Sequence, residues 1–187
     1  MGYVKKFYTA DTHFGHEAII GHCSRPFASV PEMDRYLIDR WNDVVRDGDL
    51  VYHLGDFAFA DAEYASWVFH QLNGRKILIL GNHDCRRGPQ DVRQHILDLP
   101  WDQPPVESLE VKDEGCRVYL NHYAHRTWQG SHRENSYHFY GHSHAKIPHL
   151  GRSRDVGVDC EDTAFTPRTF KELVAVLPGL ETAISHV

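Results

Sequence analysis

Apolar runs and helically spaced apolar positions alternate through the first eighty residues. The runs 3–10, 50–54 and 75–80 predict strands, and the last ends in four consecutive apolar residues, which is typical of a strand covered on both faces. Apolar residues recur at helical intervals within 29–47 and again within 61–72, so each of these segments predicts a helix. The resulting strand–helix–strand–helix–strand order indicates an α/β domain.

The remaining segments carry different signals. Residues 14–30 contain no clear period and predict a loop. Residues 106–111 and 116–120 predict a β-hairpin around a short polar turn, and further short strands are predicted at 137–140 and 155–158.

A last helix is predicted near the end of the chain. It begins at Thr169, which has capping-box spacing with Glu172, and Pro178-Gly179 is expected to stop it. The chain contains no internal repeat and no linker-like stretch. We therefore expect residues 1–187 to form a single domain.

Composition narrows the class of protein. Of 187 residues, 41% are hydrophobic and 25% charged, as in ordinary globular proteins. No stretch approaches the ~20 apolar residues needed to span a bilayer. The N-terminus lacks a signal-peptide pattern, and the four cysteines are widely spaced. We therefore expect a cytoplasmic protein with reduced thiols, without membrane contact and without an obligate protein partner.

Net charge and histidine content indicate which partners the protein can bind. A formal charge of −6 argues against a general grip on long nucleic acid, although it leaves room for a local basic groove. The chain has 15 histidines. Because histidine is the commonest metal ligand and titrates near neutral pH, their positions matter more than their number.

Five short polar motifs each follow a predicted strand. In open α/β sheets the ligand site lies at the carboxyl ends of the strands, so five strands can deliver these motifs to one place. Asp-x-His and Gly-Asp alone are typical of ordinary strand-end turns, Gly-Asn-His-Asp and Gly-His-Ser-His are more specific, and the inference rests on the set. The motifs are Asp11-Thr12-His13, Gly55-Asp56, Gly81-Asn82-His83-Asp84, Asn121-His122 and Gly141-His142-Ser143-His144.

The residue types in these motifs predict a metal centre. Carboxylate, imidazole and amide oxygen suit divalent Mn, Fe, Zn or Ni, and the lack of cysteine argues against a closed structural zinc site. Seven ligands are too many for one ion with open positions but suit two ions that share a carboxylate. The predicted ligands are Asp11, His13, Asp56, Asn82, His122, His142 and His144.

This set of motifs resembles the calcineurin-like metallophosphoesterase superfamily, whose pattern is D-x-H, G-D, G-N-H-[DE], a lone H and then G-H-x-H. Residues 11–144 carry the match, and a compact bacterial and phage branch is suggested by Arg25-Pro26-Phe27 and Val156-Gly157-Val158-Asp159. The resemblance implies a four-layer α/β/β/α sandwich and two divalent ions, with Mn²⁺ the first expectation.

The resemblance also implies a division of roles. One ion would take Asp11, His13, Asp56 and His144, and the other Asp56, Asn82, His122 and His142. Asp56 would bridge, and His83 would sit beside the leaving group as its proton donor. For Asp84 two interpretations stay open: it orients the His83 imidazole, or it caps the following turn.

Four residues are candidates for contact with substrate, each with a plainer alternative. His16 either touches substrate or makes a loop hydrogen bond, and Arg25 either reaches phosphate or pairs with a carboxylate. Arg126 and Trp128 could hold a phosphate and a base, whereas the alternative for Trp128 is packing under a loop.

The leading interpretation is a metal-dependent phosphodiesterase acting on nucleotides or nucleic acid. The first alternative is a phosphomonoesterase, including a protein phosphatase. Protein phosphatases of this superfamily carry Asp-Arg-Gly soon after Gly-Asp, and residues 55–61 contain no arginine. The second alternative is a non-catalytic scaffold, against which the retention of His83 and every ligand position argues.

Overall fold

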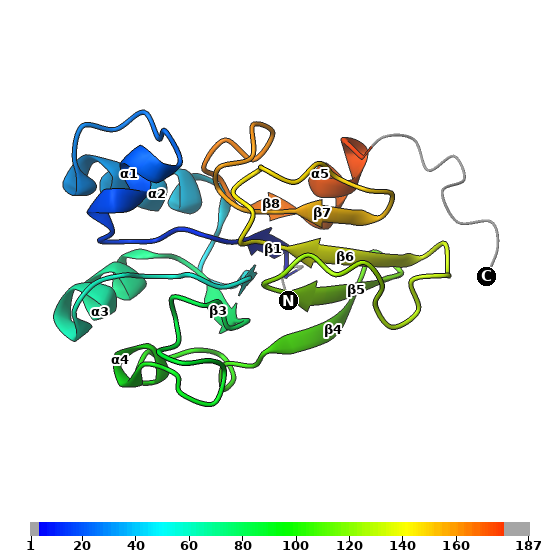
Figure 1. Cartoon of the computed structure of the whole chain (residues 1–187), viewed down its shortest axis with the longest axis horizontal. Coiled ribbons are helices and arrows are strands. Elements are labelled where there is room, and N and C mark those ends of the chain that lie inside the picture. The colour runs from blue at the N-terminus through cyan, green and yellow to red at the C-terminus, as the bar shows by residue number, and fades with distance from the viewer. Residues whose placement is uncertain (1–3, 178–187) are drawn as a thin grey trace.

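The computed structural model describes residues 4–177 and contains two four-stranded sheets flanked by helices (Figure 1). The mixed α/β class expected from the sequence is therefore confirmed. The first sheet has the order β3-β2-β1-β8. Its strands β1, β2 and β3 run parallel, and β8 pairs antiparallel with β1. The bounds are β1 Lys6–Thr9, β2 Leu50–His53, β3 Arg75–Leu78 and β8 Arg168–Thr169.

The second sheet has the order β4-β5-β6-β7. A hairpin joins β4 and β5, and β5, β6 and β7 run parallel. Glu114 and Gly115 at the hairpin turn both have positive φ, which fits the twist of a tight hairpin. The bounds are β4 Ser108–Asp113, β5 Cys116–Asn121, β6 Ser136–Tyr140 and β7 Ser153–Asp155.

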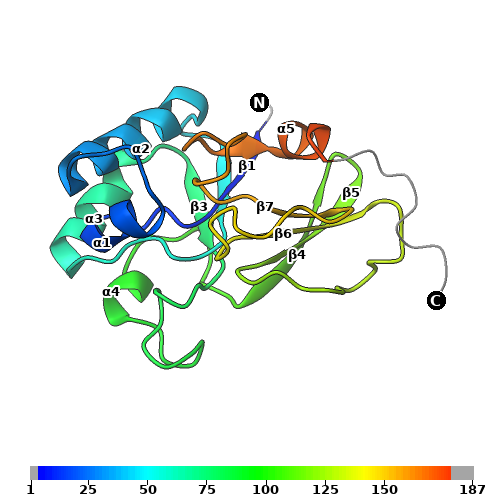
Figure 2. The same ribbon diagram turned by 45° about the horizontal axis from the view of Figure 1, so that its top comes forward.

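Five helices accompany the sheets within the described residues. Helices α1 to α4 gather on one side of the molecule, and α5 lies beside β8 (Figures 1 and 2). Ser29 caps α2 by accepting the Glu32 N–H, and Thr169 forms the expected capping box with Glu172. The bounds are α1 Glu17–His22, α2 Val30–Val44, α3 Ala62–Gln71, α4 Gln94–Leu97 and α5 Phe170–Ala175.

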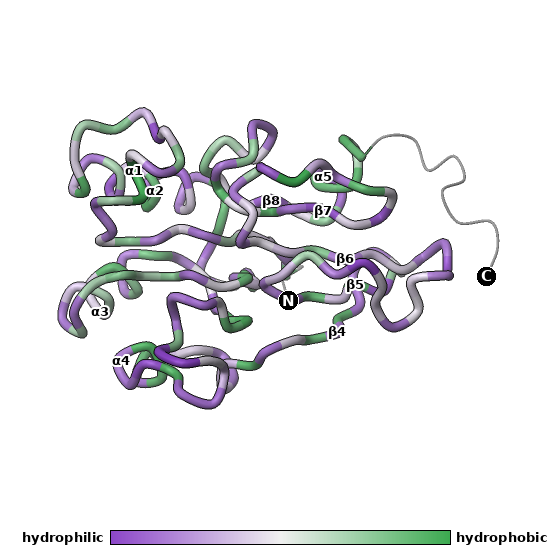
Figure 3. Tube along the Cα trace, in the orientation of Figure 1, coloured by the Kyte–Doolittle hydropathy of each residue, from purple (hydrophilic) through white to green (hydrophobic). Residues whose placement is uncertain are grey.

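Both faces of the first sheet are buried. Phe7, Val51 and Leu78 pack with helices α1 to α3, whereas the next residue of each strand packs toward the second sheet. Successive side chains of a strand point to opposite faces, so a strand between two layers is apolar throughout. This explains the continuous apolar run that ends at Leu80. Polar and apolar residues are interspersed along the chain (Figure 3), and no helix within residues 4–177 could cross a bilayer.

Several element predictions were wrong in detail. Residues 14–30, expected as a loop, contain α1, a six-residue helix with no side-chain cap whose Ile19 is buried. The short elements α4 and β8 were not predicted, because two to four residues carry no readable period. The strand expected at 155–158 lies earlier, at β7, and continues only as a bridge between Gly157 and Ala10. The expected stop at Pro178-Gly179 lies outside the described residues.

Candidate metal centre

The predicted ligands converge where the two sheets meet. Strands β1, β2 and β3 of the first sheet, and β5 and β6 of the second, each end just before one of the five motifs. The backbone joins the motifs: Asp11 N donates to Gly55 O at 3.0 Å, and Gly141 N donates to His122 O at 3.0 Å. His142 N donates to Asp11 Oδ1 at 3.0 Å and so links the two sheets.

Five of the seven predicted ligands have a left-handed backbone. Positive φ occurs in only a few per cent of non-glycine residues, so this concentration marks a locally strained structure that the surrounding fold holds in place. Such strain clusters at functional sites. The residues are Asp11, His13, Asp56, His142 and His144, with φ between 46° and 63°.

Glycine makes room for the carboxylates and imidazoles. A Cβ on Gly81 would lie 2.3 Å from Asp56 Oδ1, and one on Gly55 would lie 2.4 Å from His122 Nδ1. A Cβ on Gly141 would lie 2.8 Å from Asp11 Oδ2. The glycines of the motifs are therefore required by close approach of ligand side chains to the backbone.

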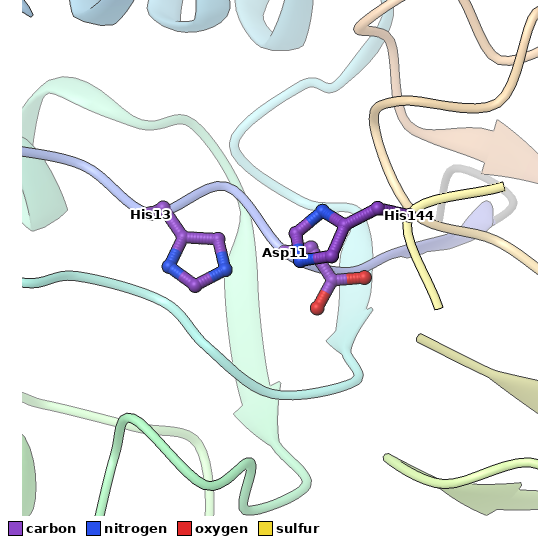
Figure 4. Close-up of side chains that lie close together, drawn as sticks. All are labelled: Asp11, His13 and His144. Atoms are coloured by element: carbon purple, nitrogen blue, oxygen red, sulfur yellow. The ribbon is translucent and has the colours of Figure 1, made fainter. Parts of the chain in front are cut away.

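The predicted ligand atoms form two groups, and His83 also places a ring nitrogen within 4.8 Å of ligand atoms of His13 and Asp56. Asp11, His13 and His144 place one ligand atom each within 4.8 Å of one another, where the extension of β1 meets the loop after β6 (Figure 4). Asp56, His122 and His142 form the second group by the same measure. The amide oxygen of Asn82 belongs with the second group, since it lies 3.1 Å from His122 Nε2.

Asp56 stands between the groups. Its Oδ2 lies 3.5 Å from His13 Nε2 and 3.5 Å from His122 Nε2, so one carboxylate oxygen faces an imidazole of each group. Its Oδ1 accepts the backbone N–H of His83 at 2.8 Å, which fixes the carboxylate plane. All three side chains are buried.

The charges of the site are mutually dependent. Burial raises the pKa of Asp11 to about 8, against the attraction of His122. Burial opposes the charge of His122, yet the hydrogen bond and attraction from Asp56, with that of Asp11, raise its pKa to about 9. Burial likewise lowers the pKa of His13 to about 2 despite Asp56. Protons on Asp11 and His122 thus occupy atoms that would otherwise bind a cation. Protons and metal ions therefore compete for the same ligands.

The residues present fit divalent metal ions. Asp11 Oδ2 and His13 Nε2 are buried without a hydrogen-bond partner, which is costly unless another group binds them. His122 Nδ1 lies 2.7 Å from the Leu54 carbonyl, so this nitrogen carries a proton, and Nε2, which faces Asp56 and Asn82, is the nitrogen that would bind a metal ion after losing its own proton. The donor set is oxygen and nitrogen, as divalent transition ions prefer.

His83 and Asp84 occupy different positions. The half-buried His83 ring lies 5.0 Å from the His13 ring and 5.5 Å from the ring of Phe59, at the edge of the site. Asp84 is fully buried and accepts the backbone N–H groups of Asp56, Phe57 and Gly81. These three donors belong neither to the His83 imidazole nor to the following turn, so both expected roles of Asp84 are replaced by a third: Asp84 holds two ligand loops together.

Two exposed aromatic rings border the ligands. Phe59 is 44% exposed and its ring lies 4.5 Å from that of His16, which itself is 5.3 Å from the His13 ring. Tyr123 is 45% exposed and its ring lies 4.8 Å from that of His142. His16 lies at the rim, where its Nδ1 lies 3.4 Å from His13 Nδ1, as the loop hydrogen bond of the alternative requires. The Tyr123 ring contacts a ligand directly, whereas the Phe59 ring contacts His16 and His83.

The structure corrects two predicted substrate contacts. Arg25 is 4% exposed and its guanidinium binds Asp159 and the carbonyls of Asp11 and Thr12, so the carboxylate-pairing alternative describes it. Trp128 donates Nε1–H to Ser136 Oγ at 2.9 Å and packs on His138, which is the packed alternative.

Arg126 is exposed on the same loop as Trp128, residues 123–136, which lies over β5 and β6. Sequence reasoning assigned no role to Phe59 or Asp159. Phe59 follows Gly55-Asp56 closely and could have been noticed as an apolar residue in a polar loop. Asp159 ends the motif Val156-Gly157-Val158-Asp159, which indicated only a branch of the family, and its role could not be predicted because its partners lie far away in the chain.

Comparisons with known proteins give the family of the chain. Residues 7–177 match the sequence profile of the calcineurin-like phosphoesterase superfamily domain, and the chain belongs to that superfamily. An uncharacterized protein of Methanocaldococcus jannaschii is 46% identical over 86 residues, covering 45% of this chain and 49% of that protein. The Gene 66 protein of Mycobacterium phage D29 is 35% identical over 82 residues, covering 42% of this chain and 39% of its own length. The match thus spans half or less of these relatives.

Solved structures share the fold. A protein of unknown function from Aquifex aeolicus superposes with a TM-score of 0.64 at 22% identity, over 94% of this chain and all of that chain. A novel archaeal phosphodiesterase superposes with a TM-score of 0.51 at 19% identity, over 82% of each chain. At these identities the likeness extends to the fold.

Proposed function

We propose that this protein is a binuclear metal-dependent phosphodiesterase that acts on nucleotides or nucleic acid. The observation that carries the proposal is the position of Asp56 Oδ2, which lies 3.5 Å from one imidazole of each ligand group. A single carboxylate oxygen facing two separate histidine clusters is the arrangement needed to bridge two cations. Membership of the phosphoesterase superfamily gives the reaction class.

The ligands divide between two ions. Asp11, His13 and His144 would hold the first ion, His122, His142 and Asn82 the second, and Asp56 both. Bound divalent ions supply Lewis acidity, which polarises phosphoryl oxygens and lowers the pKa of water. We expect Mn²⁺, with Fe, Zn or Ni as alternatives.

The remaining residues of the site act on substrate. His83, at the edge beside His13, is placed to give a proton to the departing oxygen. Arg93 donates Nε–H to the His83 carbonyl at 3.0 Å and lies over the Phe59 ring, so it adds positive charge near the leaving group. Phe59 and Tyr123 would stack on planar bases on either side of the phosphate.

A diester is favoured over a monoester for two reasons. Residues 55–61 lack the arginine of the protein phosphatases, and the exposed rings of Phe59 and Tyr123 suit a phosphate with a substituent on each side. A phosphodiesterase also occurs on this fold in the archaeal protein. A single-domain protein working in the cytoplasm remains our expectation.

The test begins with metal content. Chelator-treated protein titrated with Mn²⁺ in a calorimeter should bind two ions per chain. Asp56→Asn should weaken both binding events, whereas His142→Ala should weaken only one. Binding of a single ion, or an Asp56→Asn variant that retains both affinities, contradicts the binuclear proposal.

Activity tests the substrate class. Protein loaded with Mn²⁺, Ni²⁺, Zn²⁺ or Mg²⁺ should be assayed on an aryl diester, an aryl monoester, 2′,3′- and 3′,5′-cyclic nucleotides and single-stranded DNA. We expect the diesters to be hydrolysed with the higher kcat/KM. A strong monoester preference overturns the diesterase assignment, and inactivity on the whole panel after loading favours the scaffold alternative.

A further inference from the structure

The His144 imidazole is held from behind by a carboxylate. Its Nδ1 lies 2.7 Å from Asp159 Oδ2, and both side chains are largely buried. A histidine that gives its Nδ1–H to a carboxylate keeps the lone pair on Nε2, because a neutral imidazole carries one proton. The Asp159 contact therefore selects the tautomer in which Nε2 is the ligand nitrogen.

Asp159 is itself fixed by Arg25. The guanidinium donates Nε–H to Asp159 Oδ1 and Nη2–H to Oδ2, both at 2.8 Å. The same guanidinium donates to the carbonyls of Asp11 at 2.7 Å and Thr12 at 3.0 Å. Arg25 thus connects the carboxylate behind His144 with the backbone of the loop that carries Asp11 and His13, which belong to the same ligand group.

The same region admits a competing interpretation. Cys23, His144 and Asp159 place ligand atoms within 4.8 Å of one another and could suggest a third metal site. Both oxygens of Asp159 already accept hydrogen bonds from Arg25, so a cation there would lie beside a buried guanidinium. Two like charges a few ångströms apart in a poorly solvated site repel strongly. The geometry suits an ion pair that positions His144, and it does not suit a third ion.

We propose that Arg25 and Asp159 form a positioning pair that orients His144 and sets the affinity of one metal position, the one formed by Asp11, His13 and His144. The inference rests on the proposed binuclear function. In the other group, His122 Nδ1 is hydrogen-bonded to the neutral carbonyl of Leu54 at 2.7 Å, and the carboxylate oxygen Asp11 Oδ1 lies farther away, at 4.0 Å. A carboxylate behind a ligand histidine raises the basicity of that ligand, and its loss typically weakens metal binding 10- to 100-fold.

The asymmetry makes the proposal testable by metal binding alone. In Mn²⁺ titrations of chelator-treated protein, Asp159→Asn should weaken one of the two binding events roughly 10- to 100-fold. The other event should stay within about threefold. Arg25→Lys keeps the charge but loses the planar fork, and it should weaken the same event by a smaller factor.

A matched control separates positioning from general damage. Asp162 makes a similar two-oxygen pair with the buried Arg154, at 3.1 and 2.9 Å, and contacts none of the predicted ligands. Asp162→Asn should therefore leave both Mn²⁺ affinities unchanged. The coordinating nitrogen gives a second readout: ¹⁵N NMR of the Zn²⁺-loaded protein should show His144 bound through Nε2 with Nδ1 protonated in the wild type and in Asp162→Asn, and a mixture of coordinating nitrogens in Asp159→Asn.

Two results would overturn the proposal: equal weakening of both binding events in Asp159→Asn, or Mn²⁺ affinities in that variant equal to those of Asp162→Asn. The outcome is independent of the proposed activity, because no substrate enters the measurement. If the wild type binds Mn²⁺ but hydrolyses no diester, the function fails and the positioning pair is still tested. If the wild type binds only one Mn²⁺ ion, the binuclear proposal fails. The positioning pair then requires that Asp159→Asn weaken the binding of that ion.

Discussion

His83 and Asp84 are adjacent in sequence and differ in environment. The His83 side chain is half-buried at the edge of the ligand cluster, whereas Asp84 is fully buried beneath it and accepts three backbone N–H groups. Burial and the nearby Asp56 raise the pKa of Asp84 to about 6, against the three hydrogen bonds that favour its charge. The two residues therefore differ in role: Asp84 holds the loops together, and His83 is left at the edge of the site, where the proposed function needs a proton donor.

Replacing His83 should affect chemistry and spare the metals. We expect His83→Ala to lower kcat about 10²-fold on an alkyl diester, whose leaving alkoxide needs a proton. On a p-nitrophenyl diester, whose leaving group is stable as an anion, the loss should be much smaller. Steady-state kinetics on both substrates measure this difference. Equal losses on both would remove His83 from the role of proton donor.

At the scale of single elements, the loops after the strands carry the site. Four of the five loops contain a glycine or a residue with a left-handed backbone soon after the strand, and the loop that carries His122 is the exception. Gly81 follows β3 and packs directly against Asp56. A substitution that distorts one of these loops should therefore also weaken metal binding.

A methyl group at position 81 tests this coupling. Gly81→Ala places a Cβ 2.3 Å from Asp56 Oδ1 and 2.5 Å from Asp56 N, so the carboxylate must move. We expect Mn²⁺ affinity to fall at least about 10-fold and the free energy of unfolding to fall by about 1–3 kcal/mol. Calorimetry and urea unfolding measure the two effects.

The control is Gly21→Ala in helix α1, where a Cβ would have no neighbour within 4 Å. This variant should be stabilised by about 0.5–1 kcal/mol, since alanine loses less conformational entropy in a helix. Unchanged Mn²⁺ affinity in Gly81→Ala would mean that the Gly81–Asp56 approach is not needed by the site.

Strand β6 contains a buried histidine outside the metal centre. His138 is fully buried, its Nδ1 lies 3.1 Å from the Tyr119 carbonyl, and its Nε2 accepts the His125 N–H. Burial lowers its pKa to about 4, against the Tyr119 contact that favours the charged form. In the unfolded chain the pKa is near 6.5.

The sign of the pH effect follows from these two values. Between pH 6.5 and about 4 the unfolded chain binds a proton at this residue and the folded chain does not, so acid destabilises the fold. Relative to His138→Gln, the free energy of unfolding of the wild type should fall by up to about 3 kcal/mol across this pH range. Urea unfolding of both proteins from pH 7 to pH 4 gives the difference, and a difference that stays constant with pH would contradict the expectation.

At the scale of the whole molecule, the site is built across two sheets. Phe59 follows β2 of the first sheet, and Tyr123 follows β5 of the second. The Phe59 ring lies beside His83, and the Tyr123 ring lies beside the ligand His142. A substrate that spans the metal centre would therefore contact both halves of the fold.

Removing either ring should impair binding of nucleotides. We expect Phe59→Ala and Tyr123→Ala each to raise KM for a dinucleotide roughly 5- to 100-fold, as loss of one base–aromatic stack does. Hydrolysis of methyl p-nitrophenyl phosphate should change less. Trp67→Ala is the control, since Trp67 is 50% exposed on α3. A dinucleotide KM equal to that of the control would exclude stacking on these rings.

The amino-acid sequence determined the elements and the residues at their ends. Strand-length apolar runs, the two longer amphipathic helices and the Thr169 capping box are local patterns, and each is found where the sequence predicts it. The rule that parallel strands share one edge then brought five motifs together in prediction, and the structure brings them together in space.

Only the tertiary structure decided the roles of Arg25, Asp84 and Trp128, and the position of Asp159. Arg25 and Asp159 are 134 residues apart, so no local pattern relates them. With a different packing of its loop, Arg25 could have pointed into the site and contacted a phosphate. The spacing of apolar residues in a segment predicts which face of its helix or strand is buried. The residue that a side chain then contacts depends on how distant elements pack. The sequence therefore determined the ligand set, and the packing decided what holds it in place.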